Sequence, residues 1–173
     1  MVDRYYGEAR VKLLRHLLSI LLLPVMVAVV LPRWILLDAA ALDTRWPWTI
    51  AAVPPRTLGA LLMLAGAGLV TWCITLFATV GRGTLAPWDP TSRLVAVGPY
   101  RYTRNPMITG VATTLVGEAL LTGSRLIGLW ALVVITMNHL YFILSEEPGL
   151  ERRFGESYVE YKRAVPRWIP RIR

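Results

Sequence analysis

The chain has 173 residues, of which 55% are hydrophobic and 17% are charged, and it carries a formal net charge of +8. A soluble domain carries about 25% charged residues; here the apolar residues form long blocks with the charges between them, which excludes an ordinary water-soluble domain and indicates a membrane protein. The basic balance suits anionic phospholipid headgroups, and because no zinc-ligand spacing or separate basic helix accompanies it, nucleic-acid binding is disfavoured.

Four apolar blocks predict an all-α integral membrane fold with about four transmembrane helices. Pro24 lies inside the first block and predicts a kink, which helices in lipid tolerate. Gly59, Gly66 and Gly68 in the second block favour close approach of another helix. The last two blocks are separated only by residues 123–125, which predicts an antiparallel helical hairpin. The blocks run from about 13 to 31, 58 to 80, 107 to 122 and 126 to 145.

The segment 32–56 connects the first two blocks and combines tryptophans with charged residues, so we interpret it as a connection at the membrane interface. The basic residues before the first block and the alanines at 39–41 also fit a signal peptide. Cleavage would leave the remaining helices without their basic N-terminal anchor, which favours a retained first helix.

The distribution of basic residues predicts the orientation of the chain in the membrane. With the N-terminus inside, 15 of the 19 Lys and Arg residues fall in inner segments and four in outer segments. This asymmetry predicts that both termini lie in the cytoplasm. The membrane itself is expected to be the plasma membrane or the bacterial inner membrane. Residues 1–173 then form a single membrane domain, with two helices and an interfacial connection in 1–80 and the chemistry in 81–173.

Two polar segments, 81–106 and 146–173, are expected on the same side of the membrane, where loops on a helical scaffold often carry function. Asn105 and Pro106 predict the capped start of the third helix. Arg101 or Arg104, together with the free amides at this helix start, is a candidate anion site. The alternative is a capped helix preceded by ordinary interfacial aromatic and basic residues.

The fourth block ends in Glu146 and Glu147, with His139 about two helical turns deeper. Carboxylates at a helix C-terminus oppose the helix dipole, so a cation is expected beside them, either a protein arginine or a ligand. The alternative is that they are solvated and pair with Arg152, Arg153 or the loop arginines.

Several other sites are not predicted. The sequence has no dinucleotide-binding fingerprint and no Walker loop. His16 and His139 are too few and too far apart for a metal site, so no metal is expected. Cys73 is expected to be a small buried apolar residue. Glu118, inside the third block, is expected to pair with Arg125 near the outer end of the hairpin.

Two runs resemble the signature of the isoprenylcysteine carboxyl methyltransferase and phospholipid methyltransferase superfamily. They are GPYRYTRNPMITG at 98–110 and EEPGLERRFGESYVEYKRAVPRWIP at 146–170. The run GRGTLAPWDPTSRLVAVGPY at 81–100 is similar to the lead-in of bacterial members. The resemblance covers roughly the C-terminal half of the chain.

The resemblance implies a methyltransferase that uses S-adenosylmethionine without a Rossmann domain. It implies a cofactor at the cytoplasmic end of the last two helices, covered by the loop and the C-terminal tail. The acceptor would be lipophilic, such as a phospholipid amine or an isoprenylcysteine-like carboxylate, and would enter from the bilayer. The resemblance implies catalytic roles for Arg104, Asn105 and Glu147. It implies cofactor contacts from Tyr102, Arg104, Asn105, Pro106, Met107, Gly110, His139, Glu146, Glu147, Tyr158 and Tyr161.

The chain departs from the family pattern at two positions. Many relatives have His where Asn105 stands, and Asn is a poor general base. Many have Tyr where Ile108 stands, so the substrate pocket is expected to differ in shape. Two other functions stay open: a membrane reductase that uses NADPH, which binding of S-adenosylhomocysteine would argue against, and a non-catalytic scaffold or transporter, which would bind neither cofactor.

Overall fold

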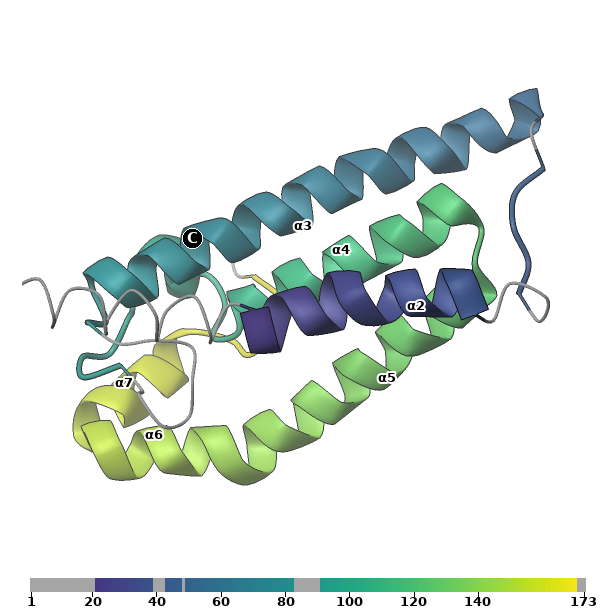
Figure 1. Cartoon of the computed structure of the whole chain (residues 1–173). Helices are drawn as coiled ribbons and strands as arrows, with labels where there is room; N and C mark the ends of the chain where they lie inside the picture. Colours follow the sequence, from purple (N-terminus) through teal and green to yellow (C-terminus); the bar gives the residue numbers. More distant parts are fainter. Residues whose placement is uncertain (1–20, 39–42, 48, 83–90, 171–173) are drawn as a thin grey trace, which may run out of the picture.

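A computed structural model describes residues 21–38, 43–47, 49–82 and 91–170, and the basic N-terminal stretch with the start of the first apolar block lies outside these residues. All regular structure in the described part of the chain is helical, as predicted. The α-helices are α2 (Leu31–Asp38), α3 (Val53–Thr79), α4 (Pro106–Thr122), α5 (Arg125–Tyr141), α6 (Glu147–Phe154) and α7 (Glu156–Ala164) (Figure 1). Wider π-helical segments span Leu21–Val30 and Phe142–Glu146, and single 3₁₀ turns span Ile50–Ala52 and Gly98–Arg101.

Two helical stretches, Ile50–Thr79 and Arg125–Phe154, are long and apolar enough to cross a membrane by length and composition. Only 11% of the apolar window of the first and 22% of that of the second are buried inside the protein, unlike the core helix of a soluble domain. The third apolar helix, Pro106–Thr122, is shorter. The exposed apolar surface of these helices is suited to contact with lipid.

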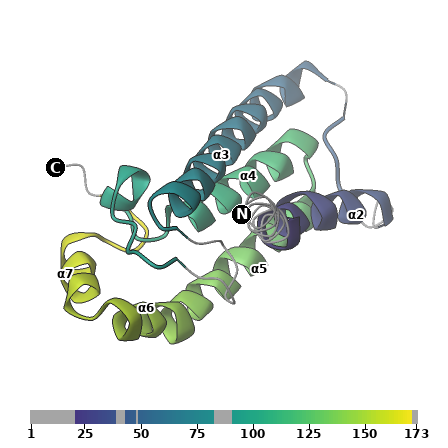
Figure 2. The same cartoon turned by 60° about the vertical axis from the view of Figure 1, so that its left-hand side comes forward.

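α3 and α4 lie side by side along most of their length (Figures 1 and 2). Their backbones approach each other at paired glycines: a Cβ added to Gly59 would lie 2.5 Å from the carbonyl oxygen of Gly117, and one added to Gly66 would lie 2.5 Å from that of Gly110. The predicted role of Gly59 and Gly66 in close helix packing is therefore confirmed. Gly68 was expected to share this role, but a Cβ there would have no neighbour within 4 Å.

The first helical unit extends further than expected. Pro24 lies in the π-helical segment Leu21–Val30, and the helix continues through α2 to Asp38 instead of ending near residue 31. Pro32 does not stop it, because the wider π-helical turns directly before it accommodate a residue without an amide hydrogen. The connection between the first two helical units is therefore shorter at both ends than the expected 32–56, since α3 already begins at Val53.

The turn between the end of α4 and the start of α5 consists of Gly123 and Ser124, and Asp43 caps it. The Ser124 hydroxyl and the Leu126 amide donate hydrogen bonds to the Asp43 carboxylate. Burial opposes ionisation, but these hydrogen bonds dominate and lower the pKa of Asp43. Trp46 adds an Nε1–H hydrogen bond of 2.7 Å to the carbonyl oxygen of Leu120. These hydrogen bonds of Asp43 and Trp46 fix the end of α4 and the start of α5 relative to each other.

The expected ion pair between Glu118 and Arg125 is wrong for the described structure. Glu118 lies on α4 with its Oε2 atom buried and without a hydrogen-bond partner among the described residues. Arg125 is exposed at the first position of α5, beyond the turn. The left-handed Gly123, with φ of 76°, reverses the chain between them, so closeness in sequence does not bring the two side chains together.

The fourth helix does not end at Glu146–Glu147 as expected. α5 passes through the π-helical turn Phe142–Glu146 directly into α6, so Glu147 is the first residue of a helix (Figure 1). The Glu147 amide donates to the carbonyl oxygen of Phe142, five residues back. Such a wide turn accommodates Pro148, which has no amide hydrogen to donate. The dipole argument that placed these carboxylates at a helix C-terminus therefore does not apply.

Candidate active site

The carboxylate of Glu147 lies at the centre of a cluster of basic side chains. Arg104 Nη1 donates to its Oε1 at 2.7 Å, and Arg167 donates from Nε to Oε1 at 2.8 Å and from Nη2 to Oε2 at 3.1 Å. Lys162 Nζ lies 3.5 Å from Oε2. Glu147 is 3% exposed, and a carboxylate buried to this extent requires such partners. The cluster joins the loop before α4, the start of α6, α7 and the tail.

The tail docks directly against the loop. The Arg104 amide donates to the carbonyl oxygen of Pro166 at 2.9 Å, and the Thr103 hydroxyl donates to that of Arg167 at 2.7 Å. The Tyr161 hydroxyl donates to the carbonyl oxygen of Tyr100 at 2.7 Å. Three contacts between segments about 60 residues apart in sequence hold the two runs that carry the family signature in one corner of the molecule.

Three buried donor groups in this corner have no hydrogen-bond partner within the described part of the chain: Arg104 Nε, Asn105 Nδ2 and the Tyr158 hydroxyl. Burial raises the pKa of Tyr158 to about 12. The negative charge of Glu147 adds to this effect and the neighbouring Arg104 guanidinium opposes it, so the hydroxyl keeps its proton. A buried polar group without a partner costs about 1–3 kcal/mol. Three of them in one corner are typical of a site that receives a ligand rich in acceptor atoms.

The remaining predicted site residues divide into two groups. Gly110 packs against Gly66 of α3, and Met107 packs against a buried apolar cluster that includes Tyr100. Pro106 is buried at the start of α4. These residues support the helices around the corner. Tyr102 is 49% exposed, and Glu146 is half-buried, with no side-chain hydrogen bond or ion pair to the described residues. Both are available to a ligand.

His139 is bound by the tail. Its Nδ1 atom accepts a hydrogen bond of 3.0 Å from Nε1 of Trp168 in the tail, and the two ring centroids are 5.8 Å apart. The position of His139 on α5 was expected from the sequence, but its partner was not. Asn105 occupies the cap position of α4 as expected, although its side chain makes no capping hydrogen bond.

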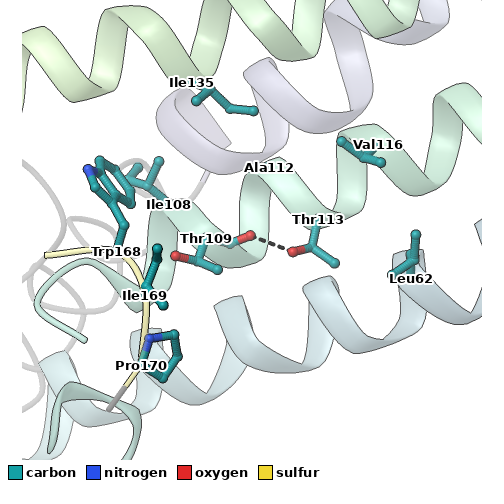
Figure 3. A pocket seen from close by; sticks show the side chains of 10 residues that line it. All are labelled: Leu62, Ile108, Thr109, Ala112, Thr113, Val116, Ile135, Trp168, Ile169 and Pro170. Carbon is teal, nitrogen blue, oxygen red and sulfur yellow. Dashed lines mark hydrogen bonds between the residues drawn. The ribbon is translucent and has the colours of Figure 1, made fainter. Parts of the chain in front are cut away.

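An apolar groove with a volume of about 510 Å³ adjoins this corner (Figure 3). The hydroxyls of Thr109 and Thr113 donate to backbone carbonyl oxygens of their own helix, which leaves the groove surface apolar. Ile108, where many relatives have Tyr, is part of the wall (Figure 3). The lining residues are Leu62, Ile108, Thr109, Ala112, Thr113, Val116, Ile135, Trp168, Ile169 and Pro170.

The sequence interpretation missed the contributions of Thr103, Lys162, Arg167 and Trp168. Arg167 and Trp168 stand in the PRWIP end of the second signature run, which was the one signal that pointed to them. Among the described residues no group of three or more His, Cys, Asp or Glu side chains is placed to hold a metal ion. The described contacts of the corner are hydrogen bonds and ion pairs, and an apolar groove adjoins it.

Comparison with known proteins agrees with these segments. The family model for phospholipid methyltransferases matches residues 55–157, which is more than half of the chain and includes Arg104, Asn105 and Glu147. No curated protein and no solved structure matches the chain. By this match, the chain belongs to the phospholipid methyltransferase family, part of the superfamily that also contains the isoprenylcysteine carboxyl methyltransferases.

Proposed function

We propose that this protein transfers a methyl group from S-adenosylmethionine to a lipophilic acceptor in the membrane. The observation that carries the proposal is the set of three buried, unpartnered donors on Arg104, Asn105 and Tyr158, placed next to an apolar groove. Arg104 and Asn105 lie in the region that matches the family model, and Tyr158 follows that region directly. A polar corner that opens beside an apolar groove suits a polar cofactor and a lipid acceptor together.

The residues fit the chemistry of this cofactor. Its amino-acid part carries a carboxylate and an ammonium group, and its ribose carries hydroxyls. Arg104 Nε, Asn105 Nδ2 and the Tyr158 hydroxyl are donors for the carboxylate or a hydroxyl. The half-buried carboxylate of Glu146 is an acceptor for the ammonium group. The sulfonium supplies an already activated methyl group, so the protein's task is to position the reactants and exclude water.

Glu147 has a different part in this proposal from the direct ligand contact expected from the sequence. Its oxygens are already engaged by Arg104, Arg167 and Lys162. We assign it the task of holding Arg104 in place and fastening the tail over the corner. Arg104 and Asn105 then contact the cofactor, and Asn105 acts as a hydrogen-bond donor and not as a base.

The membrane arrangement in this proposal has four spans: a first span that includes residues 21–38, and then α3, α4 and α5. α4 and α5 form the hairpin. Both termini, and the polar corner where the tail docks on the loop before α4, lie in the cytoplasm. The basic residues on the inner segments support this orientation. α4, at 17 residues, is about 25 Å long, so the bilayer in this proposal is locally thinned around it. The groove lies among α3, α4 and α5 and offers an acceptor a route from the bilayer.

The decisive experiment is methyl transfer in a defined membrane. The purified protein in nanodiscs is incubated with isotopically labelled S-adenosylmethionine and a bacterial membrane lipid extract, and the lipids are analysed by mass spectrometry. The expected result is label in one lipid class, a phospholipid amine or an isoprenylcysteine-like carboxylate. Binding of NADPH with no binding of S-adenosylhomocysteine would indicate a reductase instead. Binding of neither compound would indicate a scaffold.

A further inference from the structure

Trp168 connects the apolar groove to the polar corner. Its ring forms part of the groove wall beside Ile108 (Figure 3), while its Nε1–H donates to His139 at 3.0 Å. On the side of α5 the ring lies against two aromatic side chains, with centroid distances of 5.8 Å to His139 and 6.2 Å to Phe142. Phe142 is 2% exposed, so the indole stands between the groove and the buried side of α5.

The position of this ring is determined by the residues directly before it. The carbonyl oxygens of Pro166 and Arg167 accept hydrogen bonds from the loop, and the Arg167 side chain is bound to Glu147 through both carboxylate oxygens. The backbone therefore enters Trp168 with its path already fixed by the polar corner. A change in the hydrogen bonds of Pro166 and Arg167 would therefore move the indole ring. A displaced ring would in turn strain these hydrogen bonds.

The hydrogen bond to His139 fixes the orientation of the ring as well. An indole N–H donates and never accepts, so Nδ1 of His139 must carry a lone pair and no proton. The imidazole thus holds the indole edge toward α5 and keeps its other side on the groove. An indole fixed by backbone and side-chain contacts at the same time is a rigid wall, and rigid apolar walls set the shape of the molecule that a pocket accepts.

We propose that Trp168 is a specificity-determining residue that closes the end of the groove next to the polar corner, with His139 as its positioning residue. The inference rests on the proposed function and deepens it. The apolar part of the acceptor stops at the indole, so the boundary between its apolar chain and its reacting group must lie at Trp168. Acceptors are then selected by the distance between the end of the apolar part and the nucleophilic atom. Neither the family match, which ends at residue 157, nor the predicted site residues include Trp168.

The first test uses a palmitate analogue with a diazirine on a carbon close to its carboxylate, the end of the chain next to the reacting group, photolysed with the protein in phosphatidylcholine nanodiscs. Adducts are located by mass spectrometry, and the ratio of adducts on His139 and Phe142 to adducts on groove residue Val116 is measured. The wild type is expected to give a low ratio. Trp168→Ala is expected to raise it by roughly tenfold or more, because the wall is removed, whereas Trp168→Phe, which keeps a ring, is expected to raise it by less than about threefold.

Ile169→Ala is the matched control, because Ile169 lines the same groove, is 81% exposed and leaves the indole in place. This variant is expected to keep the wild-type ratio. Should Trp168→Ala lose its cooperative melting transition, Trp168→Leu is the second variant and is expected to shift the ratio in the same direction. An unchanged ratio in the folded Trp168 variant, or an equal rise in Ile169→Ala, would overturn the proposal.

The second test separates acceptor selection from support of the fold. With the bacterial lipid extract and labelled S-adenosylmethionine, Trp168→Ala is expected to change the distribution of label among lipids whose head groups differ in the distance from the apolar chain to the nucleophilic atom. Trp168→Phe is expected to keep the wild-type distribution. The affinity for S-adenosylhomocysteine is expected to change by less than about threefold, since the ring is not a cofactor contact. A lower affinity with an unchanged product distribution would contradict selection by the wall. If no lipid is methylated by the wild type, the proposed function fails, and the photolabelling pattern still decides the role of the indole.

Discussion

Arg167 and Glu147 form a two-point contact, in which Nε donates to Oε1 at 2.8 Å and Nη2 donates to Oε2 at 3.1 Å. This planar arrangement matches the fork of the guanidinium group to the two oxygens of the carboxylate. The hydrogen bond raises the already high pKa of Arg167 further, so the guanidinium is permanently charged. The contact fastens the tail to the first turn of α6, which makes Glu147 the connecting point of the candidate site.

Glu147→Gln is expected to destabilise the protein. The substitution leaves Arg104, whose side chain is 8% exposed, beside a neutral amide, and breaking a buried ion pair costs about 3–5 kcal/mol. A melting curve in detergent without cofactor should show a clearly lower Tm. The affinity for S-adenosylhomocysteine is expected to fall as well, because Arg104 loses its fixed position. A wild-type Tm with reduced affinity would instead support the direct ligand contact that the sequence suggested for Glu147.

Glu146→Gln is the comparison that separates the two glutamates. Its carboxylate makes no ion pair with the described residues, so the Tm is expected to stay close to the wild-type value. If the carboxylate binds the cofactor's ammonium group, calorimetric titration with S-adenosylhomocysteine should show an affinity lower by about 1.5–3 kcal/mol, the range for hydrogen bonds to charged groups. Unchanged affinity would remove Glu146 from the cofactor site.

Tyr158→Phe and Tyr161→Phe delete the same atom with different expected results. The Tyr158 hydroxyl is buried without a partner among the described residues, so its removal should leave the Tm unchanged or slightly higher and weaken S-adenosylhomocysteine binding by about 0.5–1.5 kcal/mol. The Tyr161 hydroxyl donates to Tyr100, so its removal should cost about 1 kcal/mol of stability. Equal effects of both substitutions on binding and Tm would argue against a cofactor contact at Tyr158.

Gly66→Ala and Gly68→Ala test the contact between α3 and α4. A Cβ on Gly66 would lie 2.5 Å from a backbone oxygen of α4, so the helices must separate and the Tm should fall. A Cβ on Gly68 meets no atom within 4 Å, and alanine in a helix is about 0.5–1 kcal/mol more favourable than glycine. Thermal unfolding in nanodiscs should therefore shift in opposite directions. A large loss of Tm in Gly68→Ala would show that another surface covers this face.

Reporter fusions at residue 45 and at the C-terminus test the proposed topology. The proposal places them on opposite sides of the membrane, because one span separates residue 45 from a cytoplasmic N-terminus and four spans separate the C-terminus from it. A reporter pair that is active on opposite sides, such as alkaline phosphatase and a fluorescent protein, is suitable. Signals from the same side would overturn the orientation and, with it, the cytoplasmic location of the polar corner.

The sequence by itself determined the all-helical class and the family, although not where the first and fourth helices end. Hydrophobic content over 20 or so residues decides whether a segment is solvated by lipid, so the block expected at 107–122 corresponds to α4 at Pro106–Thr122. The pairing of Gly59 and Gly66 with another helix also followed from composition, because only small residues permit such close backbone contact. The two signature runs carried the family assignment, since local residue order is preserved in the sequence whatever the fold around it.

Only the tertiary structure decided which of these residues meet. Glu147 was expected beside a cation, but the selection of Arg104, Lys162 and Arg167 from 19 basic residues depends on how α6, α7 and the tail fold back. Glu146 and Glu147 are neighbours in sequence and equivalent in chemistry. Successive residues on a helix point about 100° apart, so one carboxylate faces the buried cluster and the other does not. That difference arises from the rotation of a helix against its neighbours, which depends on packing between segments distant in sequence.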